Sequence, residues 1–222
     1  PDSAYTQNAL VKIISNMSTL VAMWTRISRG YDPIPPSRNM SYAENFMYMC
    51  FGEKADDEIV KLLDACLILH AEHTINASTF STMVTASTLS NPFSSIAAGV
   101  GTLAGPLHGN ANENVLVMLD EIGSPKNARA WIEDRLKNKK VIWGMGHREY
   151  KTKDPRATIL EQMIKTYVNK TGHNLSERFE TALEVESICD ELLSHKGVYP
   201  NVDFYSGILY AELFKFTKEH FT

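Results

Sequence analysis

The chain has 222 residues, of which 44% are hydrophobic and 22% are charged, and its formal net charge is −4. This composition is typical of a soluble globular protein, and the length fits one large domain or two modest ones with a sizeable core. The slight negative charge gives no indication of a nucleic acid or a membrane surface as a partner. An anionic substrate would therefore have to meet a local cluster of positive groups.

The three cysteines, Cys50, Cys66 and Cys189, lie far apart and form no C-x-x-C pair. This pattern favours reduced thiols in a cytosolic or matrix-like compartment. No charged-then-apolar leader is visible at the start of the sequence, and the most apolar stretch, Ile96 to Leu107, is too short to span a bilayer. We therefore expect a cytoplasmic protein that does not enter a membrane.

Apolar residues recur at intervals of three and four in the first half of the chain, which is typical of helices. The first such series consists of Leu10, Ile13, Ile14, Met17, Leu20, Val21 and Trp24. The prolines in residues 33–36 then force an irregular segment. Ser41 and Glu44 predict a capping box at the start of a second helix, which ends near Gly52. A third helix, capped by Asp56, has an apolar stripe of Ile59, Leu63, Cys66, Leu67 and His70.

The second half of the chain carries the same kind of signal. A helical segment from about residue 77 to 89 stops before Asn91-Pro92, since the residue before a proline disfavours a helix. Ser124-Pro125 and Asp154-Pro155 each indicate an N-cap followed by proline in the first helical position. Residues 176–195 form a further amphipathic stretch.

Strand signals are scarce, and only Val141-Ile142-Trp143, a short apolar run followed by glycine, favours an extended segment. We therefore predict an all-α fold of many helices joined by short links. The sequence contains no internal repeat and no low-complexity tract. Charged residues become denser after about Ala128, which indicates a second subdomain.

Polar, titratable residues gather in four segments. The first, His70-Ala71-Glu72-His73, places two histidines three residues apart, on one face of the predicted helix near its end. They could bind an anion or a metal, although the spacing misses H-E-x-x-H and no third ligand is obvious. One structural and one surface histidine would explain the segment equally well.

The second segment, Gly105 to Glu113, holds His108 between a Pro-Leu pair and a glycine, in a turn that we expect to precede a helix. Such a turn can fix the angle of an imidazole, and a nearby helix N-terminus would favour its neutral form. A tight loop with a capping histidine is the plain alternative.

The third segment runs from Gly144 to Tyr150 and is followed by Asp154-Pro155-Arg156. Glycines beside His147, Arg148 and lysines let backbone N–H groups and cations reach a phosphate. Arg156 lies in the first turn of the helix that Asp154 caps, where its guanidinium could grip a carboxylate with two hydrogen bonds. An exposed basic loop would also explain these residues.

The fourth segment, Asn201 to Gly207, places Asp203 between apolar neighbours just after a proline. Partial burial would raise the pKa of this carboxyl group and suit it to act as a base. The alternative is an N-cap aspartate for the following helix, and both readings can hold together.

Taken together, these segments resemble the citrate synthase family over essentially the whole chain. The resemblance rests on three blocks in order and spacing, G-P-L-H-G, G-x-G-H…D-P-R and N-V-D-x-x-S-G. It implies a two-domain, all-helical subunit that acts as a homodimer, with the active site in the cleft between a large and a small domain. Residues 1–109 would belong to the large domain, 110–208 to the small domain, and 209–222 to the return to the large domain.

The resemblance also implies the role of each residue in a reaction of acetyl-CoA with oxaloacetate that yields citryl-CoA and, after hydrolysis, citrate and CoA. His108 would hydrogen-bond the thioester oxygen, Asp203 would remove a methyl proton, and His147 would polarise the oxaloacetate carbonyl. His73 and Arg156 would bind oxaloacetate. The region that meets CoA would include Val141, Gly144, Met145, Gly146 and Lys151. CoA enters as the thioester co-substrate, and the resemblance implies no permanently bound cofactor and no metal.

Some residues depart from the family pattern, namely Glu72, Asn110, Met145 and Glu149, but none of them carries a role given above. Members of the family extend beyond both ends of this sequence and carry two later arginines that bind carboxylates. No arginine follows Arg178 here, so we expect little activity from this chain alone.

Three other readings stay open: a 2-methylcitrate synthase that uses propionyl-CoA, a non-catalytic helical dimerisation module, and a zinc-binding helical protein. The pocket around the acyl methyl group would decide the first of them, and the motifs do not report on that pocket.

Overall fold

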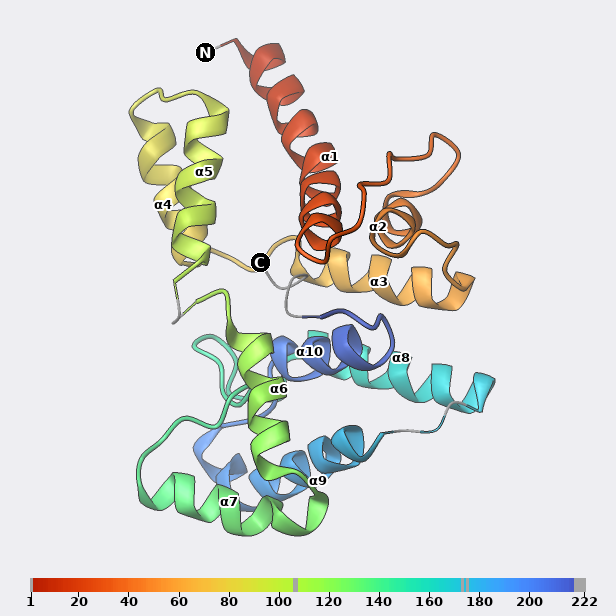
Figure 1. The fold of residues 1–222 in the computed structure, drawn as a ribbon. Coiled ribbons are helices and arrows are strands. Elements are labelled where there is room, and N and C mark those ends of the chain that lie inside the picture. The colour runs from red at the N-terminus through yellow and green to blue at the C-terminus, as the bar shows by residue number, and fades with distance from the viewer. Residues whose placement is uncertain (1, 106–107, 173, 175, 218–222) are drawn as a thin grey trace. The chain divides into compact units, whose positions relative to one another are not determined.

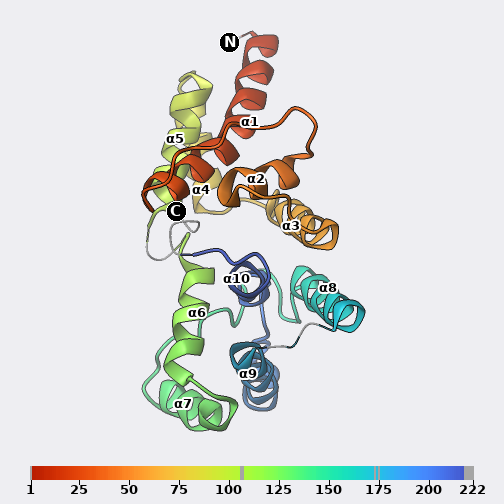
Figure 2. The ribbon, with the colours of Figure 1, turned by 45° about the vertical axis from the view of Figure 1, so that its right-hand side comes forward.

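The computed structural model describes residues 2–105, 108–172, 174 and 176–217, and within these ranges it is built from ten α-helices and no strand. The all-α prediction is therefore confirmed. The chain divides into two units, which we call unit 1 (residues 1–110 with 217–222) and unit 2 (residues 111–216). Figures 1 and 2 show the helices in two views, and each unit is described by itself. The assignment of these parts to a large and a small domain stays a prediction.

Unit 1 contains five helices. They are α1 (Ser3–Ile27), α2 (Tyr42–Phe51), α3 (Asp57–His70), α4 (Ala77–Ser87) and α5 (Pro92–Leu103). Their predicted start signals are confirmed, because Ser41 and Glu44 form a reciprocal capping box and Asp56 accepts a hydrogen bond from the Glu58 N–H group. Gly52 ends α2 with φ of 82°, a left-handed conformation that suits glycine.

The core of unit 1 is small. Ala22 of α1 packs on Met49 and Cys50 of α2, with Phe46 and Phe51 beside them. Along the predicted stripe of α3, Ile59, Leu63 and Cys66 are buried together with Leu62, while Leu67 and His70 are exposed. The predicted apolar series of α1 also lies largely at the surface, and its exposed members are Leu10, Ile14, Met17, Leu20 and Trp24.

Helices α4 and α5 form a close hairpin, visible in both views (Figures 1 and 2). A Cβ atom at Gly99 would lie 2.3 Å from Thr82 Oγ1, so the Thr82 side chain would have to turn away if a larger residue stood there. Hydroxyl groups join the pair as well, since Thr102 donates to Ser81 Oγ at 2.8 Å. The hairpin is therefore held by small and polar contacts, while its larger apolar side chains face outward.

Unit 2 contains the remaining helices: α6 (Ala111–Ile122), α7 (Pro125–Lys137), α8 (Pro155–Thr171), α9 (Glu177–Leu193), a short 3-10 turn (Ser194–Lys196) and α10 (Val202–Glu212). Helix α10 is buried along most of its length and packs against α6 and α8. A Cβ atom at Gly207 would lie 2.6 Å from the Asn112 carbonyl oxygen, so this glycine allows α10 to approach α6.

Two local predictions in unit 2 have different outcomes. Ser124 is the N-cap of α7 and Pro125 opens the helix, as expected, although the Ser124 side chain makes no capping hydrogen bond. The run Val141–Trp143 does not form a strand, because the backbone bends at Gly144, and only Met145 pairs with Pro200 in an isolated bridge. None of the helices in the described ranges has the length and apolar character needed to cross a membrane.

Candidate active site

The segment between α7 and α8 is fixed to the residues that precede α10. Asn201 donates its backbone N–H to the Gly144 carbonyl at 2.9 Å and its side-chain N–H to the Gly146 carbonyl at 2.9 Å. Gly146 donates in turn to the Tyr199 carbonyl at 2.7 Å. The loop that carries His147 and the start of the helix that carries Asp203 are therefore one hydrogen-bonded frame.

Gly144 makes this frame possible. Its φ is 76°, in the left-handed region, and a Cβ atom there would lie 2.8 Å from the Phe204 ring and 2.9 Å from Val115 Cγ2. The buried glycine thus lets the loop turn directly over the first turn of α10. Gly144 is buried and shapes the loop, and its predicted place in the region that meets CoA stays a prediction.

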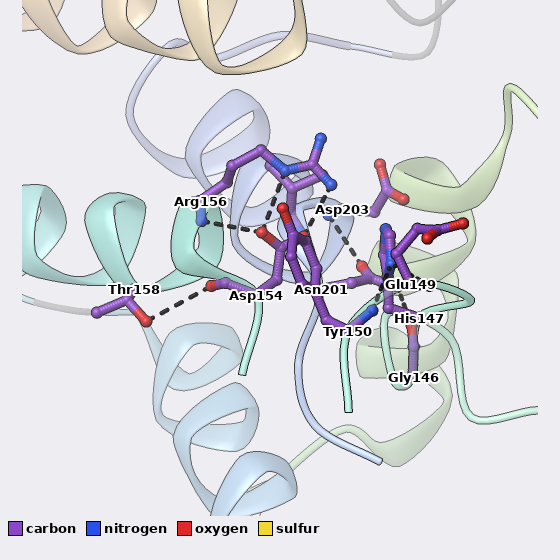
Figure 3. Close-up of polar contacts among 10 residues, drawn as sticks. Gly146, His147, Glu149, Tyr150, Asp154, Arg156, Thr158, Asn201 and Asp203 are labelled. Carbon is purple, nitrogen blue, oxygen red and sulfur yellow. Dashed lines mark hydrogen bonds and ion pairs between the residues drawn. The ribbon is translucent and has the colours of Figure 1, made fainter. Parts of the chain in front are cut away.

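His147 is held with a defined tautomer by its own loop (Figure 3). The Nδ1 atom faces the backbone N–H groups of Glu149 at 3.1 Å and Tyr150 at 3.3 Å. An Nδ1 that accepts hydrogen bonds carries no proton, so the proton of the neutral ring lies on Nε2. The ring of Tyr150 lies beside the imidazole, with 4.8 Å between the ring centroids.

Asp154 joins the starts of two helices. Its buried carboxylate accepts hydrogen bonds from the backbone N–H of Arg156 at 2.9 Å, from Arg156 Nε at 3.1 Å and from Arg156 Nη2 at 2.8 Å. It also accepts the N–H of Val202, in the first turn of α10, at 3.2 Å. Asp154 therefore caps α8, aims the Arg156 guanidinium and ties α8 to α10.

The charge of Asp154 is favoured in this setting. Burial alone would raise the pKa of the carboxyl group, but the hydrogen bonds and positive charge of Arg156 outweigh burial, and the pKa lies below its ordinary value. The Asp154–Arg156 pair is thus ionised at neutral pH, and the guanidinium is held in one orientation.

Asp203 lies in the first turn of α10, where the helix dipole favours a negative charge. It does not cap the helix, so the N-cap alternative is wrong: Asn201 is the N-cap, and its Oδ1 accepts the Asp203 N–H at 3.0 Å. The flanking residues Val202 and Phe204 are buried, whereas Asp203 keeps partial exposure. Figure 3 shows His147, Arg156 and Asp203 grouped around the start of α10.

The other residues expected to meet CoA line the same loop. Val141 and Lys151 are exposed, while Met145 and Gly146 are partly buried. Gly146 has φ of 88°, so it also adopts a conformation that suits glycine. The exposed members are therefore accessible to a ligand.

His108 and His73 belong to unit 1. His108 follows α5 in a turn in which its N–H bonds the Gly105 carbonyl at 2.9 Å, and its Nε2 lies 2.7 Å from Ser78 Oγ in the first turn of α4. Gly109 closes the turn, because a Cβ atom there would lie 2.2 Å from the Leu103 carbonyl oxygen. The neighbouring Pro106 and Leu107 of the predicted motif lie outside the described residues.

His73 does not share a helical face with His70, so that part of the prediction is wrong. Helix α3 ends at His70 with Ala71 as its C-cap, and Thr74 then turns the chain with φ of 60°. His70 Nδ1 lies 2.7 Å from the Cys66 carbonyl, one turn back along the helix, whereas His73 lies partly buried in the turn that leads to α4.

The structure thus brings together two sets of predicted residues. Unit 2 groups His147, Arg156 and Asp203 with the loop that follows α7, and unit 1 holds His73 and His108 at the turns that flank α4 and α5. Sequence reasoning missed two supporting residues, Asn201 and Ser78, and it missed the second role of Asp154, its bond to Val202. Asn201 before an apolar helical run was a recognisable capping signal, but nothing local indicated the Ser78 contact. Nowhere in the described ranges do three or more metal-ligating side chains gather.

Comparisons with known proteins show which family the chain resembles. The family model described as the C-terminal domain of citrate synthase matches residues 1–222. A citrate synthase from Synechocystis sp. is 50% identical over 212 residues, which is 96% of this chain and 53% of the relative. One from Acidithiobacillus ferridurans is 51% identical over 203 residues, or 91% of this chain and 53% of the relative. The chain therefore spans about half the length of these curated relatives.

Solved structures give the same result. Citrate synthase from Thermoplasma acidophilum, in a ternary complex with carboxymethyl coenzyme A and oxaloacetate, superposes with a TM-score of 0.91 at 33% identity, covering 99% of this chain and 58% of that one. Citrate synthase from Thermotoga maritima gives a TM-score of 0.81 at 41% identity, covering 92% of this chain and 55% of that one. The chain is 50% identical to a curated citrate synthase, and the model of the family's C-terminal domain matches it from end to end. It therefore belongs to the citrate synthase family.

Proposed function

We propose that this chain supplies the catalytic groups of a citrate synthase, which joins the acetyl group of acetyl-CoA to oxaloacetate and hydrolyses citryl-CoA to citrate and CoA. The observation that carries the proposal is the hydrogen-bonded frame of unit 2. It holds an imidazole whose Nδ1 accepts hydrogen bonds, an oriented guanidinium at the start of α8 and a partly exposed carboxylate at the start of α10. These are the groups needed to bind a keto acid and to generate a carbon nucleophile beside it.

Asp203 is the proposed base. The methyl group of a thioester is a very weak acid, so a carboxylate removes its proton only if the charge that develops on the thioester oxygen is stabilised. His108 is proposed to donate that hydrogen bond. If the Ser78 hydroxyl donates to Nε2, the proton of the neutral ring lies on Nδ1, which is then the atom that meets the thioester oxygen.

His147 and Arg156 are proposed to prepare the electrophile. The Nε2–H of His147 donates to the ketone oxygen of oxaloacetate and makes the carbonyl carbon more electrophilic. The Arg156 guanidinium pairs with one carboxylate of oxaloacetate, with a geometry fixed by Asp154. His73 contributes a further hydrogen bond to the same substrate. The new carbon–carbon bond forms between the deprotonated methyl carbon and the polarised ketone carbon.

CoA is proposed to bind along the exposed part of the loop between α7 and α8. Val141 and Lys151 present an apolar surface and a positive charge there, with Met145 and Gly146 between them. The likeness to a citrate synthase that was solved with a CoA analogue supports CoA as the co-substrate. The proposed reaction uses CoA as a co-substrate and uses neither a resident cofactor nor a metal. A propionyl-CoA reaction that gives 2-methylcitrate uses the same groups and is the finer alternative.

A homodimer in the cytoplasm is part of the proposal. The apolar side chains exposed on α1, α4 and α5 form the kind of surface that an obligate partner covers. The three buried, unpaired thiols suit a reducing compartment.

Two measurements test the proposed function. Oxaloacetate binding is titrated by calorimetry for the unmodified chain and for Arg156→Lys, which keeps the charge but loses the planar fork. We expect the affinity of Arg156→Lys to fall about 10- to 100-fold, since charge-assisted contacts contribute roughly 1.5–3 kcal/mol. A chain that binds succinate or phosphate as well as it binds oxaloacetate would contradict the proposal.

The second measurement follows deuterium exchange of the acetyl-CoA methyl group in heavy water with a non-reacting oxaloacetate analogue present. Asp203→Asn should slow the exchange by roughly 10²–10⁴-fold and leave oxaloacetate binding unchanged, because it removes only the base. Parallel assays with propionyl-CoA separate the two acyl-CoA alternatives. Equal exchange in the mutant and the unmodified chain would remove Asp203 from its role.

A further inference from the structure

A network of charged groups lies beneath the frame of unit 2, and the proposed chemistry does not use it. Lys153 directly precedes Asp154, and its side chain is only 26% exposed. Its Nζ lies 2.5 Å from Glu161 Oε2 on α8 and 2.5 Å from Glu186 Oε1 on α9. One ammonium group therefore joins the segment before α8 to two helices.

The network continues to α10. The Tyr205 hydroxyl donates to the other carboxylate oxygen of Glu186, and Lys153 Nζ lies 5.3 Å from the centre of the Tyr205 ring. Tyr205 is fully buried and lies two residues after Asp203. Burial, followed by the charge and hydrogen bond of Glu186, raises the pKa of the Tyr205 hydroxyl, so it stays a donor across the physiological pH range. Lys153 thus reaches the helix of the proposed base by two contacts, one direct and one through Glu186.

The charges of the network depend on Lys153. Glu161 and Glu186 are 16% and 18% exposed, so each carboxylate has lost much of its hydration and relies on a partner to offset that loss. Lys165 also pairs with Glu161, but it is 56% exposed and reaches neither α9 nor α10 through any contact that the structure gives. Burial alone would lower the Lys153 pKa, but the hydrogen bonds to Glu161 and Glu186 outweigh burial and raise it.

We propose that Lys153 is a positioning residue for the candidate active site, a role that rests on the proposed function. By joining α8, α9 and α10 through Glu161, Glu186 and Tyr205, it holds the His147–Asp154 segment against the start of α10. The Asp154 carboxylate then reaches Arg156 and the Val202 N–H together, so the guanidinium and the Asp203 carboxylate keep one mutual orientation. Lys153 itself contacts no substrate.

A merely structural role would make a different prediction. A lysine that only contributes to stability lowers the protection of every amide of unit 2 when it is removed. A positioning lysine loosens the contact between Asp154 and Val202 more than it loosens the core. The amide of Ile132, in the middle of α7 and fully buried, is a suitable reference for the core.

The test compares Lys153→Met with Lys153→Arg and with the matched control Lys165→Met, all in the 222-residue chain. Amide exchange by NMR gives the protection of Val202 relative to Ile132, and calorimetry gives the oxaloacetate affinity. For Lys153→Met we expect relative Val202 exchange to rise at least tenfold and oxaloacetate affinity to fall roughly 10- to 100-fold, the usual range for groups that orient a ligand-binding residue. Lys153→Arg should restore both to within about threefold, and Lys165→Met should change neither by more than about twofold.

Two outcomes would overturn the proposal. One is an unchanged ratio of Val202 to Ile132 exchange in Lys153→Met, and the other is an equal effect of the two methionine substitutions. If Lys153→Met does not fold, Tyr205→Phe takes its place, because it removes only the hydroxyl contact with Glu186. Relative Val202 exchange should then rise by about three- to tenfold. If the unmodified chain does not bind oxaloacetate, the proposed function is wrong, and the amide ratio alone decides the role of Lys153.

Discussion

The two units differ in how completely their side chains are buried. Of the 23 large hydrophobic side chains that are exposed in the described residues, 20 belong to unit 1. Unit 2 buries its apolar residues, including nearly the whole of α10, whereas α4 of unit 1 has no buried residue at all. We therefore expect unit 2 to be stable on its own, whereas unit 1 exposes an apolar surface that a partner would cover.

The difference extends to the candidate site residues. In unit 2, His147, Arg156 and the backbone of Asp203 are each fixed by hydrogen bonds within one buried frame. In unit 1, His108 lies in a turn and contacts Ser78 of another helix. The candidate site residues of unit 2 are therefore positioned by hydrogen bonds between its loop and its helix starts, while His108 is positioned by a turn and by Ser78 of unit 1.

The largest effect on the free energy of unfolding is expected in a comparison of two aspartates that cap helices. Asp154→Ala should lower the free energy of unfolding by about 3–5 kcal/mol, because it leaves the largely buried Arg156 guanidinium without its partner. Asp56→Ala, the matched change in unit 1, removes an exposed cap with one hydrogen bond to the Glu58 N–H and should cost about 0.5–2 kcal/mol. Denaturant unfolding measures both, and equal losses would contradict the contrast.

The same substitution predicts a pH dependence. The pKa of Asp154 in the folded chain lies below its ordinary value of 3.8, so its stabilisation is complete above that value and is lost as the pH falls through the folded pKa. The stability difference between the unmodified chain and Asp154→Ala should therefore be constant near neutral pH and shrink below about pH 4. A difference that persists undiminished in strong acid would show that the carboxylate charge is not its source.

Two glycines with similar backbone angles sharpen the comparison further. Gly144 and Gly30 have φ of 76° and 78°, but a Cβ atom at Gly144 would meet Phe204, whereas at Gly30 it would meet nothing within 4 Å. Gly30→Ala should cost only the left-handed strain of about 1–2 kcal/mol. Gly144→Ala should cost about 1–3 kcal/mol more because of overpacking. Thermal unfolding of the two variants tests this. Equal costs would mean that the loop at Gly144 shifts away from Phe204 without loss of stability.

The smallest effect on stability is expected at the surface of unit 1. Phe80→Gln on α4 replaces a side chain that is 61% exposed, so the stability of the monomer should change by no more than about 0.5 kcal/mol. Self-association should nevertheless weaken, because an apolar contact is lost. Ile159→Gln on α8 of unit 2 is the control and should leave self-association unchanged. Sedimentation velocity measures both, and equal behaviour of the two variants would contradict a partner surface on unit 1.

Local signals explain which features were predictable from the sequence. Ser41, Glu44 and Asp56 cap helices as expected, because capping depends on a few neighbouring residues. Asp154 was recognised as a cap for the same reason. Its bond to Val202 was not predicted, because the two residues are 48 positions apart and their contact depends on packing between α8 and α10.

The errors have physical causes as well. His73 was expected to share a helical face with His70, but α3 ends at His70, and the turn at Thr74 has a left-handed conformation that periodicity does not reveal. The apolar series of α1 correctly predicted a helix, but periodicity shows only that a helix has an apolar face and does not show what covers it. The contact between Ser78 and His108 spans 30 positions and likewise required the fold.

The measurement that tests the central claim most directly is amide exchange by NMR at the two sets of site residues. The Gly146, Asn201 and Val202 amides all donate within the frame of unit 2, and the His108 and Gly109 amides donate within a single turn of unit 1. The account predicts that the three amides of unit 2 exchange with one common protection factor, at least roughly 100-fold above that of the two turn amides, because they open only with the buried frame. Independent exchange of Gly146 and Val202, at rates no slower than His108, would contradict it.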